Sequence, residues 1–71
     1  MKMDREAVFS SNIMSAGYDP EAETLELEFK DGSVYQYYNV SSHLYDQFQA
    51  APSKGQFFNV YIKNAVPFSR V

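Results

Sequence analysis

The sequence predicts an α+β fold in which a three-stranded antiparallel β-meander is packed on one face by two C-terminal helices. Up to about residue 39, apolar and polar residues alternate, which is the two-residue period of a half-buried strand. Beyond that point the apolar residues recur at helical intervals, mostly four positions apart, as they do along one side of a helix. We therefore expect strands at about residues 11–18, 23–29 and 33–39, and helices near 42–50 and 54–63.

The length and composition of the chain indicate one small domain. Its 71 residues suffice for a single core, and six Phe and six Tyr supply the large buried areas that such a core needs. Residues 1–9 have charges of both signs and no clear periodicity, so we expect a flexible lead-in before one domain over residues 10–71. The chain has no cysteine and a single histidine, His43, which argues against disulfides and metal sites.

The first two predicted strands are separated by a proline turn. Residues 10–18 alternate weakly, and residues 19–21 then mark a turn in which Pro20 presets φ. Residues 24–29 alternate strictly between polar and apolar side chains, so this segment is the clearest strand of the sequence.

The loop of the following hairpin decides which face of the sheet each tyrosine occupies. A two-residue Asp-Gly loop would place Tyr35 and Tyr37 opposite glutamates and turn both rings toward solvent. A three-residue loop, with Gly32 in the left-handed conformation of a G1 bulge, places both rings opposite leucines. We choose the three-residue loop because it gathers the apolar side chains on one face, namely Leu25, Leu27, Phe29, Tyr35 and Tyr37. The other face then carries Glu26, Glu28, Gln36 and Tyr38.

Serine and proline residues mark the ends of the two predicted helices. Ser41 or Ser42 can cap the first helix, and Pro52 stops it. Ser53 can cap the second helix, and Asn64 is its expected C-cap.

The expected core joins the apolar face of the sheet to the apolar sides of both helices. The tail at residues 66–68 is expected to pack back onto this core. The predicted core residues are Ile13, Leu25, Leu27, Phe29, Tyr35, Tyr37, Leu44, Phe48, Phe58 and Ile62.

Charge is distributed unevenly along the chain. The net charge is −3, but residues 1–31 carry eight acids and three bases, whereas residues 32–71 carry one acid and three bases. Proteins that bind duplex DNA present a basic patch and a high pI, so this composition argues against duplex DNA. Any surface that meets phosphate is expected in the second half. No membrane-length apolar run or apolar signal region is present, so we expect a cytoplasmic protein with no membrane partner.

Short motifs follow one another along most of the chain, namely Gly17-Tyr18-Asp19, Leu25 to Phe29, Gly32, Tyr35-Gln36-Tyr37, Val40, Leu44-Tyr45, Ala51, Ser53-Lys54-Gly55, Phe57-Phe58-Asn59 and Ile62-Lys63. In their order and spacing these motifs resemble the KTSC domain family over about residues 10–71. Ser41 departs from the family pattern, in which a proline commonly follows the valine. The family is named for a domain at the C-terminus of some lysyl-tRNA synthetases and also occurs as short bacterial proteins. The resemblance implies RNA as a possible ligand.

The candidate ligand-binding residues lie in the second half of the chain. A serine cap, a lysine and a glycine at a helix start combine exposed N–H groups with positive charge, which suits a phosphate. An ordinary helix cap followed by a solvated lysine explains the same residues without a ligand. The candidates are Ser53, Lys54, Gly55, Phe57, Asn59 and Lys63.

Other residues that suggest chemistry have simpler explanations. Tyr35 and Tyr37 could stack unpaired bases, but in the chosen register we expect them in the core. His43 lies within reach of Asp46 along a helix, yet no nucleophile accompanies this pair, so we predict no catalytic residue. The acidic residues of the second strand are expected to form a solvated edge rather than a metal site, and we expect no cofactor.

These observations predict a non-catalytic binding module rather than an enzyme. We expect its ligand to be RNA or a phosphate-bearing small molecule, bound through the helical second half. The alternative is a protein-interaction module or a homo-oligomer, because the chain has more aromatic bulk than a core of this size needs.

Overall fold

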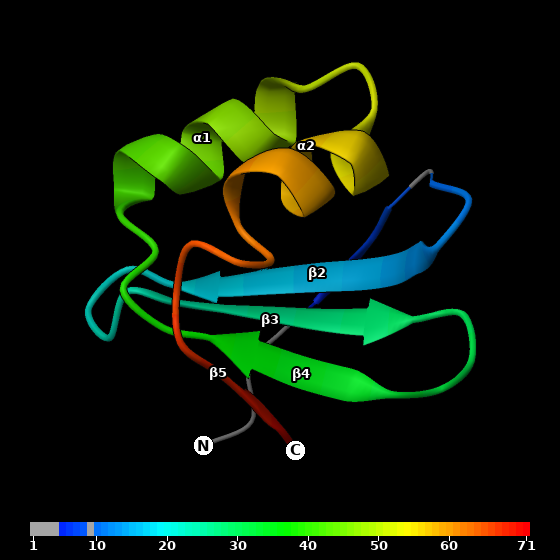
Figure 1. Ribbon diagram of the computed structural model, residues 1–71, viewed down its shortest axis with the longest axis horizontal. Coiled ribbons are helices and arrows are strands. Elements are labelled where there is room, and N and C mark those ends of the chain that lie inside the picture. Colours follow the sequence, from blue (N-terminus) through cyan, green and yellow to red (C-terminus); the bar gives the residue numbers. More distant parts are fainter. Residues whose placement is uncertain (1–4, 9) are drawn as a thin grey trace.

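The computed structural model describes residues 5–8 and 10–71. In this part of the chain an antiparallel sheet has the strand order β1-β2-β3-β4-β5, and two helices lie over one of its faces (Figure 1). The elements are β1 (Glu6–Ala7), β2 (Ile13–Asp19), β3 (Thr24–Phe29), β4 (Val34–Tyr37), α1 (Ser42–Ala50), α2 (Lys54–Tyr61) and β5 (Phe68–Arg70). The α+β class and the two helices are as predicted.

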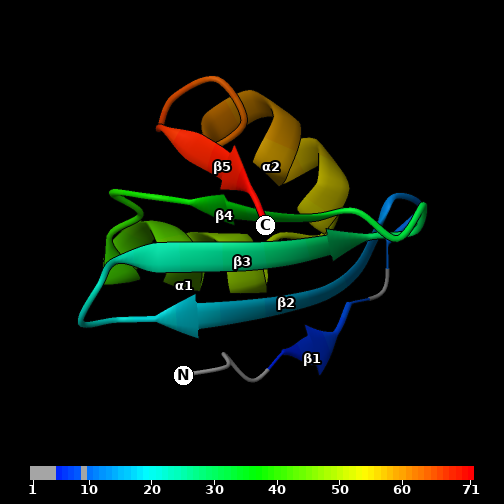
Figure 2. The same cartoon turned by 90° about the horizontal axis from the view of Figure 1, so that it is seen from below.

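The predicted three-stranded meander is too small, because the sheet has a further strand at each edge. β1 pairs with β2 through Glu6 and Ala7, and β5 pairs with β4 through Phe68, Ser69 and Arg70. Segments of two and three residues are too short to show a strand period. Seen from below, β5 lies beside β4 at one edge and β1 lies at the other (Figure 2). Of the predicted flexible lead-in, residues 1–4 and 9 lie outside the described residues.

The hairpin between β3 and β4 has the predicted three-residue loop. Leu25 lies opposite Tyr37 and Leu27 opposite Tyr35. The loop closes with a hydrogen bond of 2.9 Å from the Gly32 amide to the Phe29 carbonyl. Gly32 has φ +91°, where a β-carbon would strain the backbone. This register places the two tyrosines on the face that the helices cover.

The helix starts are as predicted, but the end of α2 is not. Ser41 accepts a hydrogen bond from the Leu44 amide at 3.1 Å, and Ser53 accepts one from the Gln56 amide at 3.3 Å. The predicted C-cap Asn64 is wrong, because α2 ends at Tyr61 and Ile62 is its cap. From Ile62 the chain continues through turns, so the helix does not extend to Asn64.

The core lies between the sheet and the helices. Seven of the ten predicted core residues are buried, whereas Phe29, Tyr35 and Leu44 are half-buried at its margin. Val40, which the prediction omitted, is fully buried, and its carbonyl accepts a hydrogen bond of 2.6 Å from the Tyr18 hydroxyl. The tail packs back as predicted, with Val66 against the core. The buried apolar residues are Ile13, Ala16, Leu25, Leu27, Tyr37, Val40, Phe48, Phe58 and Ile62.

The opposite face of the sheet is polar and internally paired. Arg5 lies 3.3 Å from a carboxylate oxygen of Glu26 and 3.8 Å from one of Glu28. Gln36 donates a hydrogen bond of 2.9 Å to Glu26 and accepts one of 3.3 Å from the Tyr38 hydroxyl. We call these five side chains the outer polar face.

Candidate ligand-binding pocket

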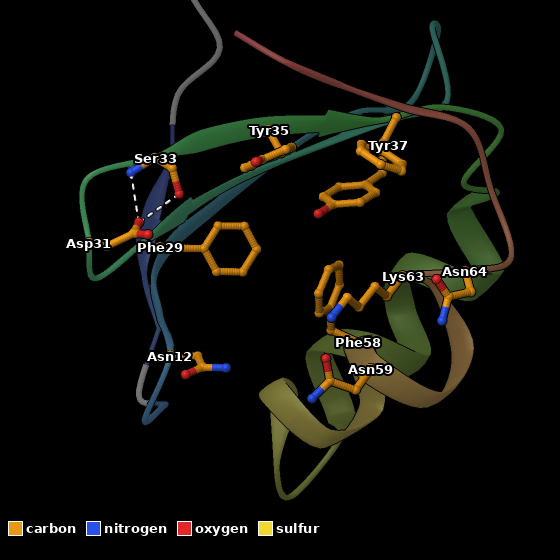
Figure 3. Close-up of a pocket in the computed structure, with 11 residues that line it drawn as sticks. Asn12, Phe29, Asp31, Ser33, Tyr35, Tyr37, Phe58, Asn59, Lys63 and Asn64 are labelled. Atoms are coloured by element: carbon orange, nitrogen blue, oxygen red, sulfur yellow. Dashed lines mark hydrogen bonds between the residues drawn. The ribbon is translucent and has the colours of Figure 1, made fainter.

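A pocket of about 360 Å³ opens between the inner face of the sheet and α2. Its sheet side comes from the β3–β4 hairpin and from β5, and its helix side comes from α2 and the turn that follows (Figure 3). Its lining residues are Asn12, Phe29, Asp31, Ser33, Tyr35, Tyr37, Phe58, Asn59, Lys63, Asn64 and Phe68. We call this the aromatic pocket.

The floor of the aromatic pocket is a connected group of rings. The ring centroids of Tyr37 and Phe58 are 5.0 Å apart in an edge-to-face arrangement, and those of Phe29 and Phe58 are 5.7 Å apart. Phe68 joins from β5, with its centroid 6.0 Å from that of Tyr35 and 5.8 Å from that of Tyr37. Contacts at these distances stabilise the rings and hold them in place.

The rings differ in how much surface they leave to a ligand. Tyr37 is 5% exposed and Phe58 is 4% exposed, so both mainly support the others. Phe68 is 55% exposed and Tyr35 is half-buried, so these two rings offer accessible faces. The pKa of Tyr37 is raised to about 12, mainly by burial and to a smaller extent by the neighbouring Tyr35. Its hydroxyl is therefore protonated at neutral pH.

The rim of the aromatic pocket is polar and exposed. Asn59 comes from α2, and Lys63 and Asn64 come from the turn that follows it. A hydrogen bond of 2.9 Å from the Lys63 amide to the Phe58 carbonyl stabilises this turn. Asn12 approaches from the segment before β2. These side chains supply amide donors and acceptors and one positive charge.

Asp31 adds a negative charge at the hairpin end of the pocket. One of its oxygens, Oδ1, accepts hydrogen bonds from the Ser33 amide at 2.9 Å and from the Ser33 hydroxyl at 2.6 Å. These bonds, led by that of the hydroxyl, hold the pKa of Asp31 below its ordinary value, and the nearby positive charge of Arg70 acts in the same direction. Asp31 is therefore ionised at neutral pH.

The structure divides the ligand-binding residues that the sequence suggested. Asn59 and Lys63 line the aromatic pocket. Ser53, Lys54 and Gly55 are at the other end of α2, which is on the order of 12 Å long. There Ser53 caps the helix, and a β-carbon at Gly55 would lie 3.1 Å from the Ser10 hydroxyl oxygen. That glycine allows close packing.

Phe57, the remaining candidate, is part of a different aromatic group. Its ring centroid is 4.7 Å from that of Tyr61 and 6.3 Å from that of Phe48. It lines a separate shallow groove with Pro52 and Val60 rather than the aromatic pocket.

Sequence reasoning missed most of the aromatic pocket. Tyr35 and Tyr37 were assigned to the core, and they do face the helices, but α1 and α2 leave part of this face open. Phe29, Tyr35 and Tyr37 alternate on one face, and that pattern identifies one wall. Nothing in the local sequence indicates that Phe68 and Asn12 join it. Phe68 arrives through the pairing of β5 with β4, and the Asn12 carbonyl accepts a hydrogen bond of 2.9 Å from the distant Lys30 amide.

The other candidates for chemistry lie apart from this site. His43 and Asp46 are both exposed on α1, and neither lines the aromatic pocket. Among residues 5–8 and 10–71, no three His, Cys, Asp or Glu side chains are grouped so that they could hold a metal ion. No helix in this part of the chain is long and apolar enough to cross a membrane.

The fold and the pocket define a small α+β domain with an aromatic cavity between sheet and helix. The model of the KTSC domain family matches residues 9–66, and the chain belongs to that family. A crystal structure of a KTSC domain protein from Yersinia pestis is similar, with a TM-score of 0.93, 38% identity and 99% coverage of both chains.

Relatives of the domain occur in proteins of very different length. A protein from Tsukamurella paurometabola is 45% identical over 56 residues, which cover 79% of this chain and 84% of that protein. A lysine–tRNA ligase from Nostoc sp. is 38% identical over 61 residues, which cover 86% of this chain. This chain spans only 11% of the length of that ligase.

Proposed function

We propose that this protein is a non-catalytic binding module that holds an unpaired base of single-stranded RNA, or a related nucleotide, in the aromatic pocket. The observation that carries the proposal is the combination of accessible rings with an exposed lysine in one cavity. Single-stranded nucleic acid is bound by stacking of bases on aromatic side chains and by cations that contact the backbone. Phe68 and Tyr35 would provide the stacking surface, and Lys63 would contact the phosphate.

The distribution of charge supports the use of the inner face. Glu26 and Glu28 on the outer polar face would repel a phosphate backbone, even with Arg5 between them. Two positive charges lie on the inner side instead. Lys63 is exposed at the aromatic pocket, and Arg70 of β5 lies opposite Tyr35 of β4. The relation to part of a lysine–tRNA ligase supports RNA as the ligand class, because the name of that relative indicates a protein that acts on tRNA.

Two lysines near opposite ends of α2 provide a matched test. Anisotropy of a labelled single-stranded RNA should show weaker binding at moderate than at low salt, and Lys63→Glu should weaken it further. Lys63→Glu should also reduce the slope of log K against log salt by roughly 0.7, the value for one lost contact to a single strand. Lys54→Glu makes the same change of charge outside the pocket, and we expect it to have much less effect.

Each outcome of this test has a clear meaning. If RNA does not bind, or binds with an affinity indifferent to salt, the proposal is wrong. If Lys54→Glu and Lys63→Glu weaken RNA binding equally, RNA contacts the whole length of α2, as the sequence suggested, and is not held in the pocket.

A second candidate function is self-association through the outer side of α2. Val60 is 64% exposed and Tyr61 is 57% exposed, and both border the groove lined by Pro52 and Phe57. Large apolar side chains grouped at a surface favour contact with another protein. Sedimentation of the wild-type chain and of Val60→Lys tests this candidate. A monomer at all concentrations would exclude it.

A further inference from the structure

The charged residues of the aromatic pocket restrict the kind of base that fits it. The amides of Asn12, Asn59 and Asn64 can each donate and accept hydrogen bonds, so they can meet either kind of group on a base. An ionised aspartate can only accept, and a lysine can only donate. A ligand that uses both groups therefore turns hydrogen-bond donors toward Asp31 and a negative charge or acceptors toward Lys63.

Asp31 is held in place and still has accepting capacity. Both hydrogen bonds from Ser33 fall on Oδ1, and the residue is exposed at the hairpin turn. The second oxygen, Oδ2, accepts neither of these bonds. Ser33 thus fixes the carboxylate through Oδ1, so Oδ2 can accept a hydrogen bond from a ligand while both Ser33 bonds are kept.

The two charges belong to different sides of the pocket. Asp31 comes from the β3–β4 turn and Lys63 from the turn after α2, and the rings of Phe29 and Phe58 lie between them in Figure 3. A ligand that satisfies both charges has hydrogen-bond donors at one end, a flat apolar body in the middle and a negative charge at the other end.

Guanine is the common base that meets these requirements best. Its N1–H and its exocyclic amino group are adjacent donors, which together match a carboxylate. Adenine and cytosine present one donor beside an acceptor, and uracil presents one donor between two acceptors. A carboxylate is repelled by acceptors placed against it.

We infer that the aromatic pocket selects guanine, with the Watson–Crick edge of the base on Asp31 and its phosphate toward Lys63. This inference rests on the proposed function. It adds a specificity that stacking alone does not provide, because every base has a face that can stack.

Binding of four mononucleotides tests the inference directly. We expect GMP to bind more tightly than IMP, which lacks the exocyclic amino group, and more tightly than AMP and UMP. The preference over UMP should be at least about fivefold, the low end of the discrimination that a good bidentate contact gives. NMR shift titration of the full chain measures these affinities and shows whether the shifts fall on residues of the pocket.

Asp31→Asn is the variant that isolates the carboxylate. Its amide oxygen can still accept both hydrogen bonds from Ser33, so the hairpin turn is retained, whereas the charge is lost and a donor replaces one acceptor. We expect this variant to bind GMP at least about fivefold more weakly and to bind UMP no more weakly than the wild type, because the repulsion of the uracil acceptors is removed.

The outcomes separate this inference from the proposed function. Binding of all four nucleotides with equal affinity, or GMP binding that Asp31→Asn leaves unchanged, overturns the selection of guanine but leaves the binding module. Failure of every nucleotide and RNA to bind overturns both. The comparison of GMP with IMP uses only the wild-type chain, so it remains decisive if the variant does not fold.

Discussion

The two faces of the sheet are built from the same strands and have opposite characters. On the outer polar face, charged and polar side chains satisfy one another, as Arg5 does with Glu26 and Glu28. On the inner face, rings pack on one another around a cavity whose exposed lysine and amides are available to a ligand. Because side chains alternate along a strand, neighbouring residues belong to faces with different roles. The side chains of the outer polar face pair with one another, and the recognition that we propose falls to the face that the helices only partly cover.

The largest expected effect comes from removing an inner-face side chain. Leu27 is fully buried, so Leu27→Ala should lower the free energy of unfolding by about 2–5 kcal/mol. The total free energy of unfolding of a domain of this size is roughly 3–5 kcal/mol, so a large fraction of the variant molecules would be unfolded. Urea unfolding followed by circular dichroism measures the change.

The neighbouring residue on the opposite face provides the control for that experiment. Glu28 lies on the outer polar face of the same strand, and Glu28→Gln should change the stability by about 1 kcal/mol or less. Similar losses for the two variants would show that the faces are not energetically distinct.

An intermediate effect is expected at high pH, because the inner face buries a phenol. The pKa of Tyr37 is raised from its ordinary value of 10 to about 12, which means that folding favours the neutral form. The stabilisation is fully present below pH 10 and is lost as the pH rises through about 12.

Urea unfolding at pH 8, 10 and 12 should therefore show a decline in stability that Tyr37→Phe reduces. The phenylalanine variant keeps the ring but has no proton to lose, so it separates this residue from the other groups that titrate at high pH. If the stability of Tyr37→Phe falls as steeply with pH as that of the wild type, the decline is not due to Tyr37. Ultraviolet absorbance of the phenolate follows the ionisation independently.

The smallest expected effect concerns the ion pairs of the outer polar face. Arg5→Ala removes the contacts to Glu26 and Glu28 and should cost about 1 kcal/mol or less. The difference from the wild type should shrink at high salt, where exposed charges are screened. Thermal unfolding at two salt concentrations measures it. A loss as large as that of Leu27→Ala would mean that the arginine anchors the N-terminal strand rather than only pairing charges.

Local patterns in the sequence predicted a large part of the fold. Strict alternation identified β3, helical spacing identified α1 and α2, and the count of three loop residues gave the register that pairs Leu25 with Tyr37. Each of these follows from interactions within a few residues or across one tight turn. The strands β1 and β5 and the turn after α2 were not predicted, because short segments become strands only when a neighbouring edge is available for pairing.

The candidate site shows the same division at the level of single residues. Asn59 and Lys63 were identified from their place in the more basic half of the chain, and both line the aromatic pocket. Lys54 has the same charge and lies nine positions earlier along the chain, yet it is not among the lining residues. The sequence gives the spacing of the two lysines along the chain, but it does not say which of them lies beside the sheet.

By itself the sequence determined the faces of the central strands, the starts of both helices and the family of the chain, because these depend on residue order over short distances. The tertiary structure alone decided that the C-terminal tail adds a strand beside β4 and brings Phe68 to Tyr35, which completes the wall of a cavity. A cavity is the space left where segments distant in the sequence pack incompletely. No local pattern records that space.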